Sequence, residues 1–135
     1  MKLTLRQILN GSAFTIHALV LNGACETQEF FTKAERDDAD EFASLIALLE
    51  RTSNHGPPRN KEKSRDVGDD IFEFKTKSLR VCYFYDKGRM IICTHGFGKP
   101  QKKVQNREIK HALELRKLYF NLKEKTPIPI EKPQP

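Results

Sequence analysis

Three apolar runs in close succession restrict the fold more than any other feature of this sequence. Residues 71–76, 79–86 and 89–97 are each rich in aromatic and β-branched side chains, and only short polar breaks separate them. Such runs are typical of β-strands, and connections this short join antiparallel neighbours. The sequence therefore predicts an antiparallel three-strand meander at the centre of the fold.

The turn between the second and third runs reads Asp86-Lys87-Gly88, in which Gly88 can adopt the positive φ of a tight hairpin. A two-residue loop would place Arg80 opposite His95 on one face of the sheet. A three-residue loop would place Arg80 opposite Thr94 and send His95 to the other face. The sequence leaves both registers open.

Further strand and helix patterns precede and follow the meander. Residues 14–21 end at Asn22-Gly23 and predict a strand followed by a turn. Residues 106–123 place apolar and charged side chains on opposite sides of a helical wheel, which predicts an amphipathic helix packed on the sheet. After a short helical piece near residues 26–31, an apolar stripe at i, i+3, i+4 and i+7 predicts another helix, with Phe42, Leu45, Ile46 and Leu49.

The order of these elements predicts an α+β fold, in which a small antiparallel sheet packs against N-terminal helices and a C-terminal helix. Residues 1–13 receive no assignment, and the polar stretch 57–70 is expected to form an exposed connection. We expect one domain over residues 1–125. Residues 126–135 contain four prolines and are expected to form an extended or disordered tail.

The charge balance favours some partners over others. Lys and Arg number 24 against 18 Asp and Glu, which gives a net charge of +6. A basic chain attracts phosphate-rich or acidic partners more than basic ones. No uninterrupted apolar stretch approaches the ~18 residues of a membrane span, so we expect a cytoplasmic protein.

Several chemical classes find no support in the sequence. The three cysteines form no CxxC pair and have no histidine at zinc-ligand spacing, so neither a zinc site nor a disulfide framework is indicated. P-loop, GxSxG, HExxH and GxGxxG patterns are absent. We therefore expect no metal and no cofactor.

Basic residues cluster near the predicted strand ends. Lys75 ends the first strand of the meander, Arg80 begins the second, and Lys99, Lys102 and Lys103 follow the third. Neighbouring strand ends could bring these cations into one positive concavity that binds an RNA backbone and stabilises developing negative charge. For Lys102 and Lys103 a solvated role that prevents edge pairing is an equal alternative, and for Arg80 a structural role stays open.

Two residues are candidates for proton transfer or base recognition. His95 could act as a general acid or base because its ordinary pKa lies near neutrality, although a histidine at a strand end is more often structural. Tyr83 could stack on an RNA base, and the alternative is a position in the core or on the sheet surface.

Four short motifs follow one another along the middle of the chain. They are SNHGPP, IFEFK, LRVCYF and IICTHGFGKPQKKVQNREIKHA. In this order and spacing they resemble the phage-derived branch of the RelE/HigB superfamily of bacterial type II toxins. The resemblance covers about residues 14–123.

The resemblance implies a compact RelE-like fold and, for many members, ribosome-dependent cleavage of translated mRNA. It also implies a cognate antitoxin, often a helix-turn-helix protein. Such an endoribonuclease, or mRNA interferase, needs no metal, because the ribose 2′-hydroxyl attacks the adjacent phosphorus while side chains orient it and stabilise the charge.

The resemblance also implies roles for individual residues. Arg80 matches the family's sheet arginine, which is thought to contact the scissile phosphate, and Lys75 matches the basic position that closes the preceding strand. His95, Lys99 and Lys102 match positions of the closing motif.

Two positions depart from the family pattern. Pro100 stands where a basic residue is usual, and Gln105 replaces the proline that commonly opens the last helix. Two other functions therefore stay open beside the interferase. One is a gyrase-inhibiting (ParE-like) toxin of the same fold, and the other is an inactive prophage remnant that only binds an antitoxin.

Overall fold

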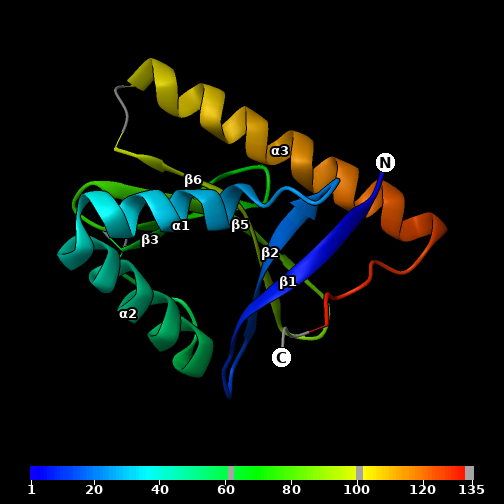
Figure 1. The fold of residues 1–135 in the computed structure, drawn as a ribbon, viewed down its shortest axis with the longest axis horizontal. Helices are drawn as coiled ribbons and strands as arrows, with labels where there is room; N and C mark the ends of the chain where they lie inside the picture. Colours follow the sequence, from blue (N-terminus) through cyan, green and yellow to red (C-terminus); the bar gives the residue numbers. More distant parts are fainter. Residues whose placement is uncertain (61–62, 100–101, 133–135) are drawn as a thin grey trace.

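The fold is a six-stranded sheet with helices on both faces (Figure 1). The structure is a computed structural model that describes residues 1–60, 63–99 and 102–132, apart from the side chains of residues 102–104. The strand order is β1-β2-β6-β5-β4-β3. The α+β fold class is thus confirmed. In chain order the elements are β1 (Leu3–Asn10), β2 (Thr15–Leu21), α1 (Glu26–Asp37), α2 (Ala39–His55), β3 (Ser64–Gly68), β4 (Ile71–Lys75), β5 (Leu79–Asp86), β6 (Met90–Gly98) and α3 (Lys102–Lys125).

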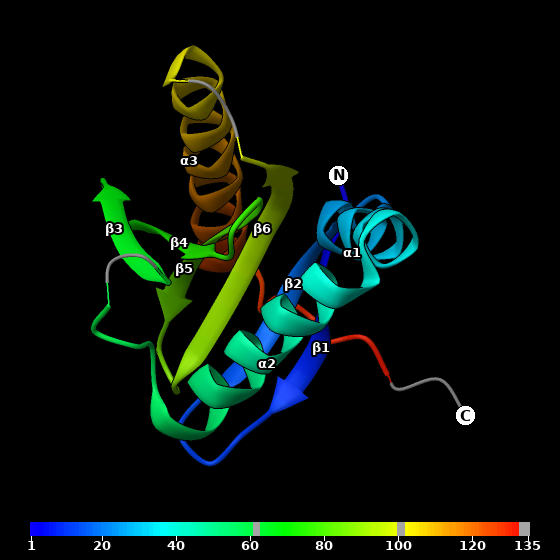
Figure 2. The same ribbon diagram turned by 90° about the vertical axis from the view of Figure 1, so that its left-hand side faces the viewer.

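The predicted meander forms β4, β5 and β6, but the sheet is larger and less uniform than expected. Strand β2 pairs with β6 in parallel, whereas the other neighbouring pairs in the described sheet are antiparallel. The chain leaves β2, passes through α1 and α2 on one face, and returns through the meander, so β6 runs in the same direction as β2 (Figure 2).

Two strands occur where none was predicted. Strand β1 lies in the unassigned N-terminal residues, where only Leu3 and Leu5 point into the core before a register shift interrupts the alternation. Strand β3 lies within residues 57–70, which were expected to form a connection without a strand. Its sequence, SRDVG, is almost entirely polar, and pairing with β4 rather than burial of apolar side chains makes it a strand.

The hairpin between β5 and β6 has a three-residue loop, because Asp86 pairs with Met90 across it. Within the loop, Gly88 has φ 80° and Arg89 has φ 59°, so the left-handed backbone extends beyond the glycine. Asp86 accepts a hydrogen bond from the Lys87 amide at 2.7 Å, which closes the turn.

A β-bulge changes the register farther along the same pair of strands. Tyr83 pairs with Cys93, but Cys82 pairs with His95, so β6 contributes one extra residue at this point. Arg80 consequently lies opposite Phe97. Both expected partners of Arg80, His95 and Thr94, are wrong for two reasons. The loop Lys87–Arg89 by itself would place Arg80 opposite Gly96, and the bulge moves its partner one residue farther, to Phe97.

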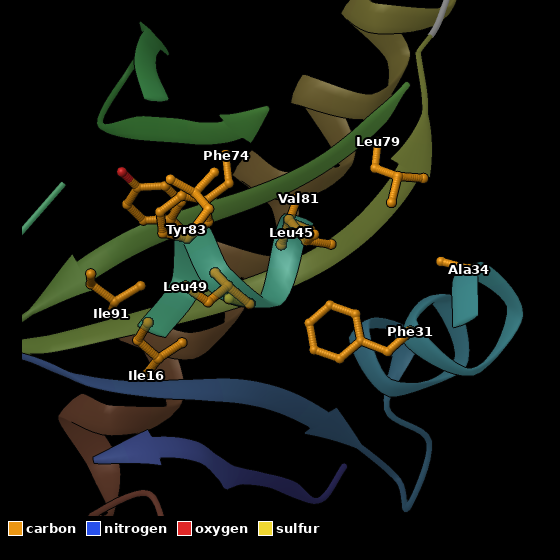
Figure 3. Packing of buried hydrophobic residues seen from close by; sticks show 12 residues of the cluster. Ile16, Phe31, Ala34, Leu45, Leu49, Phe74, Leu79, Val81, Tyr83 and Ile91 are labelled. Carbon is orange, nitrogen blue, oxygen red and sulfur yellow. The ribbon is translucent and has the colours of Figure 1, made fainter. Parts of the chain in front are cut away.

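Helices α1 and α2 cover one face of the sheet. The predicted stripe on α2 is confirmed, since Leu45 and Leu49 are fully buried and Phe42 and Ile46 pack against the same cluster. These side chains meet inward-facing residues of β2, β4, β5 and β6 (Figure 3). The sheet contributes Ile16, Phe74, Val81, Tyr83 and Ile91 among others.

Helix α3 covers the opposite face, as the amphipathic pattern predicted (Figure 2). Ala112 and Tyr119 are buried against Phe84 and Ile92 of the sheet. The Tyr119 hydroxyl donates a hydrogen bond to Asp86 at 2.6 Å, which ties the last turns of α3 to the hairpin. Strand β5 therefore lies between two apolar clusters.

The first half of the C-terminal tail is ordered, so disorder is wrong for these residues. The Leu5 amide donates to the Pro129 carbonyl at 2.9 Å, and the Glu131 amide donates to the Leu5 carbonyl at 2.7 Å. Arg6 and Glu131 add an ion pair at 2.9 Å. The tail thus runs beside β1 as a short strand-like extension of the sheet.

No helix in the described part of the chain is long and apolar enough to cross a membrane.

A close approach of two backbones gives the first prediction. A Cβ atom on Gly11 would lie 2.1 Å from the Ser53 carbonyl oxygen, at the point where the Ala13 and Phe14 amides of the β1–β2 turn donate hydrogen bonds to that same oxygen at the end of α2. Gly11→Ala should therefore lower the free energy of unfolding by roughly 1–3 kcal/mol in urea titrations. Gly98→Ala is the control, because its Cβ would meet nothing nearer than 3.9 Å and should leave stability almost unchanged.

Candidate functional site

Three of the predicted cations come to the same end of the sheet. Lys75, the last residue of β4, pairs directly with Arg80 near the start of β5. Lys99 follows β6, and its amide donates to the Ser78 carbonyl at 2.7 Å in the turn between β4 and β5. Lys99 is exposed and Lys75 is partly exposed. The strand register therefore places a cationic group around the β4–β5 turn.

Arg80 differs from the other two because its side chain is buried. Its residue is 7% exposed, and its guanidinium lies 3.6 Å from the carboxylate of Glu73, which is fully buried on β4. Nη1 donates to the carbonyls of Thr76 at 2.7 Å and Leu79 at 2.9 Å. Burial lowers the pKa of Arg80, and the Glu73 charge opposes that effect. In this conformation the main role of Arg80 is structural, because its guanidinium binds Glu73 and two backbone carbonyls.

Glu73 is the residue that the sequence interpretation missed. Its Oε1 also accepts a hydrogen bond from Nε of Arg65 on β3 at 3.3 Å, while its Oε2 is buried without a hydrogen-bond partner. The three side chains of Arg65, Glu73 and Arg80 thus carry one net positive charge. A charged residue between two phenylalanines in the run IFEFK was the available signal.

His95 is 4% exposed and faces α3, since it pairs with Cys82 of the α3-covered face. Its Nε2 lies 3.2 Å from Glu108 on α3, and its Nδ1 lies 3.0 Å from the Thr94 hydroxyl. With a proton on Nε2, the ring donates a hydrogen bond to Glu108, and Nδ1 accepts from the Thr94 hydroxyl, whose single proton also points toward the Cys82 carbonyl at 3.3 Å. Burial, together with the neighbouring His111, lowers the pKa of His95 to about 4. The ring is therefore neutral near pH 7.

The surroundings of His95 are acidic. It borders a groove of about 670 Å³ between α1 and β6, to which Glu26, Glu29, Asp37 and Asp38 contribute. Negative charge of this density repels phosphates, which favours a structural role for His95 over contact with RNA.

Tyr83 lies in the core, and its assignment as a base-stacking residue is wrong for this conformation. It is fully buried, its ring stacks on Phe74 with centroids 4.0 Å apart, and its hydroxyl lies 2.9 Å from the Ser64 hydroxyl (Figure 3). No ring face is open to a base. Lys102 and Lys103 begin α3, and their side chains lie outside the described part of the chain, as does Pro100.

Among the described residues, no group of three or more His, Cys, Asp and Glu side chains could hold a metal ion. The three cysteines are buried and unbridged. The cationic end of the sheet can bind an anion electrostatically and position its atoms.

Comparison with known families gives one match. The family model described as Phage derived protein Gp49-like (DUF891) matches residues 30–117, from α1 into α3. The match includes every candidate site residue named above. No curated protein matches the chain.

The Arg80–Glu73 pair predicts a characteristic pattern of stabilities. Arg80→Met leaves the buried Glu73 carboxylate with Arg65 alone and should lower the free energy of unfolding by roughly 3 kcal/mol. Glu73→Met/Arg80→Met removes both charges from a mostly apolar environment and should recover most of that loss in urea titrations. If the double variant is less stable than Arg80→Met, the pair is not the source of the effect.

The buried His95 predicts a pH dependence of stability. Its pKa is about 4 in the folded protein and about 6.5 when unfolded, so the unfolded chain binds more protons between these values. The contribution of His95 is complete above about pH 6.5 and is lost as the pH falls toward about 4, by up to about 3 kcal/mol. Burial also lowers the pKa of His17, which acts in the same direction.

Urea titrations from about pH 7.5 to about pH 5 measure this dependence above the range in which carboxylates titrate. His95→Gln should have a shallower profile than the parent, whereas the exposed His55→Gln should match the parent. Parallel profiles for parent and His95→Gln would contradict the assignment.

Proposed function

We propose a toxin function for this chain, which belongs to the Gp49-like family of phage-derived proteins. That family is associated with toxin–antitoxin pairs. The finer proposal is that the protein is an endoribonuclease that cleaves mRNA during translation. The observation that carries it is the cationic end of the sheet, formed by Lys75, Arg80 and Lys99.

The accessible charges suit an RNA backbone. Lys75 and Lys99 are the two members of the group with exposed surface, so they are the residues proposed to contact phosphates. Arg80 lies directly opposite Lys75 on the neighbouring strand, and the net positive charge that it shares with Arg65 and Glu73 adds to the local field. We assign Arg80 a positioning role as long as it stays paired with Glu73.

The proposed reaction needs only groups of the RNA and nearby cations. The ribose 2′-oxygen forms a bond to the adjacent phosphorus as its proton passes to solvent water, and the bond from phosphorus to the 5′-oxygen breaks as that oxygen takes a proton from water. The products are a 2′,3′-cyclic phosphate and a 5′-hydroxyl. Lysines stabilise the additional negative charge on the phosphoryl oxygens, and correct placement of the 2′-oxygen accounts for much of the remaining acceleration.

The proposed partners are translated mRNA on the ribosome and a cognate antitoxin, for which a helix-turn-helix protein is the expected type. The acidic groove beside α1 adjoins the basic sheet end, because its lining includes Ser78 and Gly98 next to Lys99. We propose that an antitoxin bound in this groove would also cover part of the sheet end.

Induced expression in a bacterial host, combined with mapping of mRNA 5′ ends, tests the proposal. The parent should arrest growth and produce cuts inside translated reading frames. Lys75→Ala/Lys99→Ala should lower the cut frequency by at least about tenfold, because two phosphate contacts are lost. Lys87→Ala/Lys117→Ala is the matched control, since both lysines are exposed and lie on the β5–β6 hairpin and on α3.

The role of Arg80 is tested with Glu73→Met/Arg80→Met, which is expected to remain folded while its cut frequency falls. Growth arrest without mRNA cuts, accompanied by DNA-damage signalling, would refute the endoribonuclease in favour of gyrase inhibition. Soluble parent protein without any arrest would favour an inactive remnant. Equal cut frequencies for Lys75→Ala/Lys99→Ala and its control would refute the proposed contact of the sheet end with RNA.

A further inference from the structure

We propose that a groove beside α2, which meets the sheet end at Lys75, binds the phosphate backbone of single-stranded RNA. The groove has a volume of about 760 Å³ and lies between the second half of α2, the segment that follows it, and the β4–β5 turn. The inference rests on the proposed function for the identity of the polymer, and its test is independent of cleavage.

The charged residues that line this basic groove in the described part of the chain are all basic. Its basic residues come from three separate segments, namely Arg51, Arg59, Lys63, Lys75 and Lys77. None of the described lining residues is acidic. In the described part of the chain, Arg51, Arg59 and Lys63 take part in no ion pair, and all three are exposed. Their charge is therefore available to a polyanion.

The wall formed by Lys63 and the end of β4 is fixed by backbone hydrogen bonds. The Lys75 amide donates to the Lys63 carbonyl at 2.8 Å, and the Lys63 amide donates to the Asn60 carbonyl at 3.0 Å. Lys63 and Lys75 are thereby held next to each other, although twelve positions separate them in the sequence. Binding an anion between them requires little ordering of the backbone.

The turn at the other end is held by the start of α2. The Thr76 hydroxyl donates to the Glu41 carboxylate at 2.7 Å, and the Ser78 amide donates to the same oxygen. These contacts, with the Thr76 hydrogen bond first among them, hold the pKa of Glu41 below its usual value. Glu41 stays charged, but its carboxylate is directed to the turn and does not line the groove.

The remaining lining indicates how a ligand is recognised. Ala47, Leu48 and Pro58 supply an apolar floor, and the described lining contains no aromatic ring on which a base could stack. Arginine and lysine recognise phosphate, and several cations along a groove suit a polymer better than a single anion. The groove should thus bind RNA with little sequence preference and with strong salt dependence.

Lys75 connects the basic groove with the sheet end, because it lines the first and pairs with Arg80 in the second. A strand bound in the groove would continue toward the Lys99 side. The groove would then supply affinity, and the sheet end would act on the phosphate that reaches it.

Fluorescence anisotropy of the full chain with a labelled 2′-O-methyl oligouridine tests the groove. This probe cannot be cleaved by 2′-hydroxyl attack, so binding is measured apart from catalysis. Arg59→Glu/Lys63→Glu should weaken binding by at least about tenfold at about 0.1 M salt. Lys110→Glu/Lys117→Glu is the control, since it changes the net charge equally on α3, across the sheet, and should weaken binding by less than about threefold.

The salt dependence supplies a second readout. Losing two phosphate contacts should reduce the slope of log affinity against log salt by about 1.4, at about 0.7 per contact on a single strand. Equal losses in the two variants, or an unchanged slope in the groove variant, would overturn the proposal. Inorganic phosphate that displaces the probe at micromolar concentration would show a small-anion site instead, and polyglutamate that displaces it as well as oligouridine would show an acidic protein site.

The proposed function and the groove can fail separately. Groove-dependent binding of the probe without mRNA cuts in cells would retain the groove and refute the endoribonuclease. Cuts in cells that persist at the parent level in Arg59→Glu/Lys63→Glu would retain the endoribonuclease and overturn the groove as its RNA-binding surface.

Discussion

Strand β5 is buried on both faces, and this constraint determines the roles of the residues around it. Val81 and Tyr83 face α1 and α2, whereas Cys82 and Phe84 face α3. A charge within such a strand must be neutralised locally, because an unpaired ion in an apolar environment is strongly unfavourable. Glu73 on the neighbouring strand provides that charge for Arg80. The cation that the family resemblance assigned to the scissile phosphate is therefore the one most involved in the fold.

The elements that the sequence predicted correctly have strong local periodicity. The meander and the helices α2 and α3 have apolar residues at intervals of two or of three and four, and this spacing reflects burial directly. Strands β1 and β3 lack such spacing, because β3 is held by pairing and β1 contains a register shift. The bulge beside Thr94 could not be predicted from the sequence either, since one extra residue in a strand leaves no recognisable signal in composition or spacing.

The candidate site was predictable only to the level of the backbone. Adjacent strand ends correctly brought Lys75 and Lys99 close to the β4–β5 turn, because short connections determine which ends meet. Side-chain burial depended on helices far away in the sequence, and it removed Tyr83 from any surface. The basic groove was not predicted, since Arg51 comes close to Lys75 only when α2 packs on the sheet, and Lys63 only when β3 pairs with β4.

The tail beside β1 makes the two edges of the sheet unequal. Residues 129–131 occupy hydrogen-bonding groups of Leu5, whereas the outer side of β3 is paired with no other described strand. Open-ended stacking of sheets requires an available edge on each side of every molecule. With one edge capped near its middle, lateral association through backbone pairing would end at two copies joined through β3. A short proline-containing peptide thus occupies part of the edge that such stacking would need.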